Sequence, residues 1–336
     1  MKIYDCFIVY NELDLCEIRF NVLKDVVDRF VVVEGTRTHT GKPKPLYFNE
    51  NKERFAAFKD KIIHVIVDDF PEPPADYTEQ QTSWMREDWQ RNAIMRGLKE
   101  AKPEDIVIVG DVDEIPRPEV IAKAKASHFK GVTTLRLDIS CYYLNFKNFV
   151  HQYITATKMF SFGSLDDPKV WKNRIALDKH DPNINRGKTL TAIRCMRTPR
   201  AIRHAGWHFS YMGGADAIVR KIGAIAIEYA NADNTNPEWL RKAIEKGDDI
   251  TGCGGRFFVV PLDETFPKYV LENREKYAAY IYEPDAGYFK RTKWERRRCF
   301  WRGWIRRNGA KLIPRPFKQF LYDHVYCKLV KEPILM

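Results

Sequence analysis

The N-terminal third of the chain alternates short apolar runs with segments whose apolar residues recur at helical spacing. The runs are rich in β-branched residues, which is typical of buried parallel strands. They are Ile3–Tyr10, Arg29–Glu34, Lys61–Val67 and Ile106–Val109. A helix is predicted after the first run, and a longer one over Ser83–Ala101, capped by Thr82 or Ser83. This alternation predicts an α/β protein with an open, doubly wound parallel sheet.

The second half of the chain has a more mixed pattern. We expect strands over Val132–Phe146, Thr189–Met196 and Arg203–Met212, and helices over Ala215–Ala230 and Pro237–Lys246. No internal repeat is apparent along the chain.

Composition and length narrow the class of protein. The chain has 336 residues, of which 44% are hydrophobic, so it can bury a large core. No stretch approaches the ~20 apolar residues of a membrane helix, and the N-terminus lacks the layout of a signal peptide. We therefore expect a cytoplasmic protein. Its seven cysteines are scattered without a CxxC pair, which argues against a disulfide framework or a zinc site.

The formal net charge of +11 is concentrated near the C-terminus. Residues 290–331 carry fourteen Lys or Arg against two acids, interleaved with aromatic residues. Such a segment can lie on an anionic membrane surface, which would make the protein peripheral on the cytosolic face. A solvated helix pair packed on the domain is the alternative interpretation. Nucleic acid is not expected, because the usual recognition motifs are missing.

Three carboxylates follow a buried run in the segment DIVIVGDVDEIPRP, residues 105–118. Asp111, Val112, Asp113 and Glu114 should lie at the carboxyl end of a strand, where doubly wound sheets bind ligands. Alternation places Asp111 and Asp113 on one side of that strand. Two such carboxylates suit Mg²⁺ or Mn²⁺ together with substrate phosphates. The alternative is that Asp113 and Glu114 are favourable charges at the start of the next helix.

Other polar residues should lie at the same edge of the sheet. Asn11 and Glu12 follow the first strand and Glu34 ends the second, so they can grip a nucleoside; ordinary loop and cap chemistry is the alternative. Arg86 falls on the apolar face of the Ser83–Ala101 helix, where its guanidinium can hold phosphate. An internal ion pair, for example with Glu87, explains Arg86 equally well.

Four ordered segments together resemble glycosyltransferase family 17. They are YNELDLCEIRFNVLKDVVDRFVVVEGTRTHTGKPKPL, WMREDWQRNAI, VGDVDEIPRP and HAGWHFSYMGG, and the resemblance covers residues 1–285. It implies a GT-A-type, Rossmann-like nucleotide-sugar fold, a UDP-N-acetylglucosamine donor, a divalent metal and inversion at the anomeric carbon. It also implies a nucleotide-sugar-binding half, 1–118, and an acceptor and catalytic half, 119–285. The basic aromatic extension, 286–336, has no counterpart in the resemblance.

The HAGWHFSYMGG segment can supply further parts of such a site. In a strand, His204 and His208 share one face, Gly206 between them leaves room for a ligand, and Trp207 points the other way. His208 can complete the metal shell, while His204 and Trp207 can contact the acceptor sugar, Trp207 by stacking. The alternatives are strand histidines bonded to backbone and a core tryptophan.

Inverting transfer also needs a base that takes the proton from the acceptor hydroxyl. Asp216, at the start of the helix after Gly213 and Gly214, is the first candidate, although it can equally be an N-cap. Glu228 and Asp138 are weaker candidates.

The sequence thus predicts an inverting, metal-dependent glycosyltransferase that uses Mn²⁺ or Mg²⁺ and a UDP-sugar, with a glycan or glycolipid acceptor. Two other classes stay open. One is a metal-dependent phosphatase or nucleotide-sugar hydrolase, because such enzymes also use a D-x-D after a parallel strand. The other is a basic surface-binding module without catalysis.

Overall fold

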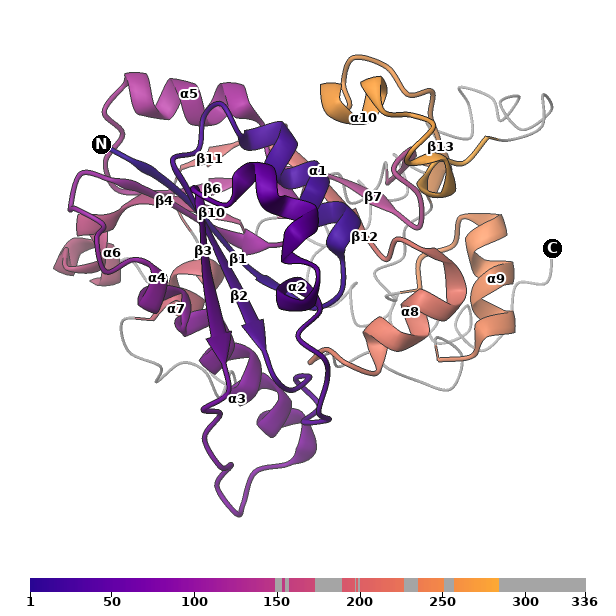
Figure 1. Cartoon of the computed structure of the whole chain (residues 1–336), viewed down its shortest axis with the longest axis horizontal. Coiled ribbons are helices and arrows are strands. Elements are labelled where there is room, and N and C mark those ends of the chain that lie inside the picture. Colours follow the sequence, from indigo (N-terminus) through magenta and orange to yellow (C-terminus); the bar gives the residue numbers. More distant parts are fainter. Residues whose placement is uncertain are drawn as a thin grey trace, which may run out of the picture.

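The structure is a computed structural model of the chain. It describes residues 1–148, 153–154, 157–172, 189–196, 198, 200–226, 235–250 and 257–283. Within these ranges the chain forms two sheets with helices packed around them (Figure 1). No helix in the described ranges is both long enough and apolar enough to cross a membrane.

The larger sheet has the strand order β11-β6-β10-β4-β1-β2-β3. Its strands are β1 (Ile3–Val9), β2 (Arg29–Gly35), β3 (Ile62–Val67), β4 (Ile106–Asp111), β6 (Val132–Leu135), β10 (Lys158–Ser161) and β11 (Ala201–Ile202). The block β4-β1-β2-β3 is parallel, as the sequence predicted. Strand β10 runs antiparallel to both of its neighbours, so the whole sheet is mixed.

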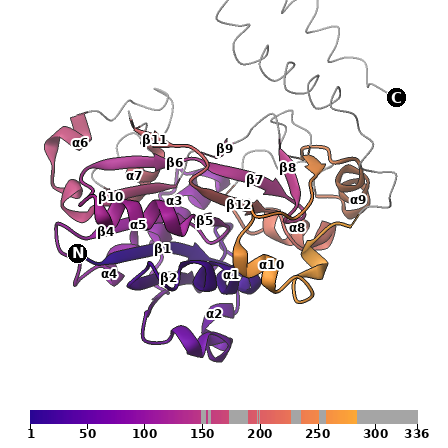
Figure 2. The same cartoon turned by 90° about the horizontal axis from the view of Figure 1, so that it is seen from above.

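Helices cover both faces of this sheet (Figures 1 and 2). Side chains of β1 alternate between the faces, with Ile3 and Phe7 in one apolar cluster and Tyr4 and Cys6 in the other. The first cluster is closed by α1 (Leu13–Leu23), α2 (Tyr47–Glu50), η1 (Lys52–Phe58), α5 (Pro118–Ala126) and α10 (Lys268–Glu272). The second is closed by α4 (Ile94–Gly97), η2 (Phe162–Leu165), α6 (Pro168–Lys172) and α7 (Leu190–Cys195). Helix α3 (Glu79–Asn92) packs against β1, β2 and α7. This is the layered arrangement of a doubly wound protein.

The smaller sheet has the order β13-β8-β7-β12-β5, with β9 beside β7. Its strands are β5 (Glu114–Pro116), β7 (Leu137–Cys141), β8 (Phe146–Asn148), β9 (Tyr153–Ile154), β12 (Gly206–Ser210) and β13 (Phe257–Val259). Helices α8 (Gly214–Ile222) and α9 (Pro237–Lys246) pack together and close a third apolar cluster. The short helix η3 (Ala278–Tyr280) completes the described chain.

Gly206 has a structural role that differs from the predicted one. A Cβ atom at this position would lie 2.2 Å from the carbonyl oxygen of Ile115, which belongs to the neighbouring strand β5. The glycine is therefore needed for the close approach of β12 to β5, rather than to make room for a ligand.

Several predicted elements are wrong or misplaced. Thr189–Met196 is not a strand: it contains helix α7, whose first turn is capped by Thr189, the acceptor for the amide of Ala192 at 3.2 Å. The long helix begins earlier than predicted, at Glu79, because Thr78 and Gln81 form a capping box, and it ends at Asn92. The predicted strand Val132–Phe146 is broken into β6, β7 and a loop.

The end of the described chain returns to the first helix. Tyr280 donates a hydrogen bond of 2.5 Å to Asp14, and Tyr269 donates one of 3.1 Å to Glu17. Val270 and Tyr277 are buried in the apolar cluster that α1 helps to form. The segment before the predicted domain boundary at residue 285 therefore packs on the core. The division of the chain into domains stays a prediction. Residues 284–336, with the basic extension, lie outside the described ranges.

Candidate active site

The candidate site lies where the order of the parallel strands reverses. From β1 the chain proceeds to β2 and β3 on one side, whereas β4 pairs with the other side of β1. Loops that leave β1 and β4 then diverge and open a crevice at the carboxyl edge, which is where open α/β sheets bind ligands. A cavity of about 530 Å³ lies at this point, and it is lined by residues from both sheets and from α3 and α8.

Asp111 ends β4 and is held by two arginines. Arg91 of α3 donates to its Oδ1 at 2.9 Å, and Arg194 of α7 donates to its Oδ2 at 2.5 Å. Burial acts to raise the pKa of Asp111, but the charges of Arg194 and Arg91 outweigh it and lower that pKa to about 2. Arg91 is itself held by Glu87 at 2.7 Å. Asp111 is thus a fixed carboxylate, whose side chain is still 33% exposed toward the cavity.

Glu114 is the buried counter-ion of the same network. It accepts hydrogen bonds from Arg194 at 2.6 Å, from the hydroxyl of Thr157 at 2.7 Å and from the amide of Asp111 at 3.0 Å. Its side chain is almost fully buried, so it does not act as a charge at the start of helix α5. Glu114 instead fixes Arg194 and the backbone of Asp111.

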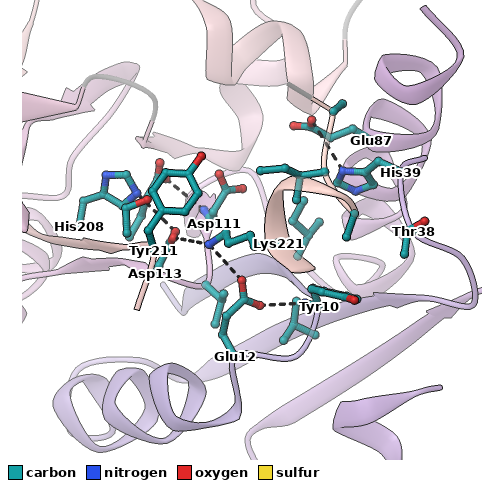
Figure 3. A pocket seen from close by; sticks show the side chains of 18 of the residues that line it. Tyr10, Glu12, Thr38, His39, Glu87, Asp111, Asp113, His208, Tyr211 and Lys221 are labelled. Atoms are coloured by element: carbon teal, nitrogen blue, oxygen red, sulfur yellow. Dashed lines mark hydrogen bonds and ion pairs between the residues drawn. The ribbon is translucent and has the colours of Figure 1, made fainter. Parts of the chain in front are cut away.

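Asp113 has a different set of partners (Figure 3). The ammonium of Lys221, from α8, lies 3.0 Å from its Oδ2, and Nε2 of His208, from β12, lies 3.6 Å from its Oδ1. Burial acts to raise the pKa of Asp113, but Lys221 and His208 outweigh it and hold the pKa far below its usual range. Lys221 also lies 3.1 Å from Oε1 of Glu12, which follows β1. One lysine therefore joins the acids that follow the two strands at the point of reversal.

His208 faces the cavity beside Asp113. Burial acts to lower its pKa, but the charge of Asp113 outweighs burial and raises it, so the imidazole is stabilised as a cation. Its Nδ1 is buried and has no hydrogen-bond partner within the described chain. A protonated histidine does not bind a metal, so His208 fits the predicted metal shell only after losing its proton.

The acids at this edge have the donor type that Mg²⁺ and Mn²⁺ prefer. Asp111 and Asp113 both line the cavity, with their carboxylate oxygens paired to cations of the chain. Within the described residues no group of three or more His, Cys, Asp or Glu is arranged to hold a metal by itself. The two carboxylates therefore fit a divalent ion that takes its remaining ligands from substrate phosphates and water.

The structure brings some of the predicted site residues together. Glu12, Asp111, Val112, Asp113 and His208 all line the cavity.

Other predicted donor residues lie elsewhere. Asn11 is exposed and does not line the cavity. Glu34 is fully buried and accepts hydrogen bonds from the amides of Phe48 and Asn49, so it caps helix α2 and cannot reach a donor. Arg86 donates to the carbonyl of His39 at 3.2 Å, in the loop after β2, and does not line the cavity.

The predicted acceptor residues also lie outside the cavity. Trp207 is buried, donates to the carbonyl of Thr265 at 2.8 Å and has Arg117 over its ring at 4.2 Å, so it cannot stack on a sugar. His204 is 65% exposed and lies 2.8 Å from Asp138, and neither of them lines the cavity.

The first candidate for the base does not line the cavity. Asp216 is 66% exposed and lies 3.3 Å from Arg241. Asp216 lies in the first turn of α8 and is not its N-cap residue. The N-cap position is occupied by Gly213, and no side chain caps the helix there. Glu228 lies outside the described residues.

Three cations of the site were not predicted from the sequence: Arg91, Arg194 and Lys221. The signal for Arg91 is its spacing from Glu87, since residues four apart on a helix pair with each other. Arg194 was hidden because its segment was read as a strand. Lys221 borders the apolar stripe of α8, between the buried Ile218 and Ile222, which places its ammonium near the other elements.

Fold and site together define an α/β protein with a charged ligand pocket at the carboxyl edge of its parallel strands. The sequence pattern of Glycosyltransferase family 17 matches residues 1–253, which is most of the chain. The chain therefore belongs to glycosyltransferase family 17, as its four motifs predicted.

Individual relatives are similar over a shorter region. The human protein named beta-1,4-mannosyl-glycoprotein 4-beta-N-acetylglucosaminyltransferase is 35% identical over 121 residues, which cover 34% of this chain and 22% of the human one. The rat protein of the same name is 34% identical over the same shares. The alignment thus spans less than a quarter of the length of these curated relatives. Among solved structures, S. aureus TarS 1-349 has 14% identity and a TM-score of 0.32, covering 73% of this chain and 72% of that one.

Proposed function

We propose that this protein is an inverting, metal-dependent glycosyltransferase with a GT-A-type fold. In this proposal it transfers N-acetylglucosamine from UDP-N-acetylglucosamine to a glycan or glycolipid. The observation that carries the proposal is the coincidence of family membership with Asp111 and Asp113 in a cavity at the strand reversal. The name of the human and rat relatives, which specifies N-acetylglucosamine transfer, supports the choice of sugar.

The chain supplies groups suited to a nucleotide diphosphate. A divalent ion on Asp111 and Asp113, when bound, would neutralise the leaving diphosphate. Lys44 lines the same cavity, with its ammonium 5.7 Å from the ring centre of Tyr10 and 5.4 Å from that of Tyr47. Tyr10 also lines the cavity, so its ring is available to a uracil base while Lys44 faces a phosphate.

We propose Asp249 as the acceptor base in place of Asp216. A base must lie within hydrogen-bond reach of the acceptor hydroxyl, and therefore in the cavity, which Asp249 lines. Asp113, His208 and Lys221 line the same cavity as Asp249. A carboxylate there can accept the proton as the hydroxyl attacks the anomeric carbon.

A donor screen tests this function. The protein is incubated with Mn²⁺ and a panel of UDP- and GDP-sugars, and nucleotide release and thermal shift are measured. We expect release and stabilisation with UDP-N-acetylglucosamine above the other sugars. A lack of preference for any UDP-sugar contradicts the proposal. Release of a nucleoside monophosphate and a sugar 1-phosphate from the same donors would instead favour the phosphatase or hydrolase class.

We also propose that residues 290–331 bind an anionic membrane surface. Their fourteen basic residues and interleaved aromatic residues support this assignment. Liposome flotation of the full chain and of a form that ends at residue 289 tests it. Equal flotation of both forms on phosphatidylserine vesicles contradicts it.

A further inference from the structure

Lys221 lines the pocket between two acids. Its ammonium lies 3.0 Å from Asp113 and 3.1 Å from Glu12, so it bridges the acids that follow β4 and β1 (Figure 3). Burial acts to lower the pKa of Lys221, but the charges of Asp113 and Glu12 outweigh it and raise the pKa above its usual value. The lysine is therefore a permanent cation in the place where a divalent ion would meet Asp113.

The helix that carries Lys221 is fixed by its other side. Ala215, Ile218 and Ile222 of α8 are buried in the third apolar cluster, against α9 and the smaller sheet. The long side chain of Lys221 can therefore change its partner while the helix stays in place, because a lysine has a flexible stem that ends in a point charge.

We propose that Lys221 is an internal counter-cation that competes with the divalent metal for Asp113 and transfers to the donor diphosphate when the nucleotide binds. The inference rests on the proposed function, since it assumes a metal and a diphosphate in this pocket. Without nucleotide, a metal on Asp113 either displaces the ammonium or stays beside it, and both cost free energy because like charges repel. With nucleotide, the diphosphate offers the ammonium a new anionic partner.

This exchange makes metal and nucleotide binding cooperative. Mn²⁺ binds weakly to the protein alone and more tightly once a diphosphate has drawn Lys221 away. By linkage, Mn²⁺ tightens the binding of the nucleotide by the same factor. The fixed pairs of Asp111 with Arg91 and Arg194 take no part, because their guanidinium groups are buried and held from several sides.

The test measures Mn²⁺ affinity by titration calorimetry, with and without UDP. In the natural protein we expect UDP to tighten Mn²⁺ binding by about tenfold or more. In Lys221→Met, Mn²⁺ alone should bind about tenfold more tightly than in the natural protein, and the effect of UDP should shrink. The matched control is Lys242→Met, which removes an exposed lysine from the neighbouring helix α9, outside the cavity lining, and should leave both affinities unchanged.

A second variant protects the test against misfolding. Lys221→Arg keeps the ion pairs, but its guanidinium holds a carboxylate with two hydrogen bonds, so Mn²⁺ alone should bind more weakly than in the natural protein. Tighter Mn²⁺ binding in Lys221→Arg, or unchanged binding in a folded Lys221→Met, overturns the inference. The Mn²⁺ affinities of the variants are measured without UDP, so they test the competition at Asp113 independently of nucleotide binding. A protein that fails to bind UDP would contradict the proposed function and not this competition.

Discussion

The two acids of the D-x-D sequence lie in contrasting surroundings. Asp111 is held by Arg91 and Arg194, which are themselves fixed by Glu87 and Glu114. Asp113, two positions further on, is held by a lysine and a histidine. Arginine stays charged and binds carboxylates through a rigid fork, whereas lysine is flexible and histidine titrates near neutral pH.

This difference assigns separate tasks to the two sides of one pocket. The Asp111 side is a buried network that connects β4, α3 and α7, so its first contribution is to the stability of the fold. The Asp113 side is built from partners that can move or lose a proton, so it is suited to exchange ligands during a reaction cycle. The same short motif thus combines an anchor with an exchangeable position.

The largest effect on stability is expected from Arg194→Met, which removes the ion pairs of Arg194 with Asp111 and Glu114. The change leaves Glu114 buried without its cation, and breaking a buried pair in this way costs about 3–5 kcal/mol. Urea denaturation measures the loss of unfolding free energy. The control is Arg241→Met, which breaks the exposed pair with Asp216 and should cost no more than about 1 kcal/mol. Similar losses in the two variants would show that the buried network is not an anchor.

A second pair of variants tests whether the catalytic base is Asp249 or Asp216. Asp249→Asn removes the proposed base and should lower kcat by about 10²–10⁴-fold, with a small change in KM for the donor. Asp216→Asn changes an exposed residue away from the cavity and should leave kcat as it is. Initial rates with the donor found in the screen decide between them, and the reverse result would restore Asp216 as the base.

The pH dependence of stability sharpens the contrast further. His208 has a raised pKa because Asp113 outweighs burial, with Glu114 adding to the increase and Lys221 opposing it. The folded protein therefore binds this proton more tightly than the unfolded chain does. The stabilisation is complete below the ordinary histidine pKa of about 6.5 and is lost as the pH rises through the raised value.

His208→Gln should remove this pH dependence. Unfolding free energies of the natural protein and the variant are compared at several pH values in EDTA. Their difference should decrease between pH ~6.5 and the raised pKa. A difference that grows with pH would mean that the folded protein lowers the pKa of His208.

The smallest effect is expected from Trp207→Phe, next to His208 on the opposite face of β12. The variant keeps most of the ring but loses the hydrogen bond to Thr265, which should cost about 0.5–1.5 kcal/mol of stability. Because Trp207 does not line the cavity, kcat should stay the same. Thermal unfolding and initial rates measure both quantities. A large fall in kcat would support the sugar-stacking role that the sequence suggested.

The parallel strands could be predicted from the sequence because each of them is buried on both faces. Ile106–Asp111 is an example: its apolar residues form one continuous run, and the run ends at the ligand edge. Helix α7 could not be predicted in the same way. Its segment is too short for its apolar residues to show a helical period. The buried arginine in it, Arg194, is paired with Glu114, which is far away in the sequence.

Among the predicted site residues, Glu12, Asp111 and Asp113 meet in the cavity because the carboxyl ends of β1 and β4 lie at one edge of the sheet. His208 reaches the same cavity from within β12. Arg86 was chosen because it shares a stripe with Trp89, Ala93 and Gly97. Ala93 and Gly97 are buried, but Trp89 is 39% exposed, so the buried part of the stripe does not extend to Arg86. Arg91 is the buried arginine of this helix. Its role could not be predicted because it depends on the tertiary contact with Asp111.

The return of residues 257–283 to helix α1 has a consequence for how the chain folds. Tyr269 and Tyr280 contact residues that are separated from them by more than 250 positions. During synthesis the first helix therefore emerges long before the segment that covers it, and its apolar surface stays exposed meanwhile. Contacts of such long sequence separation slow folding, and exposed intermediates aggregate easily. A nascent chain of this protein should therefore depend on chaperones until that segment has left the ribosome.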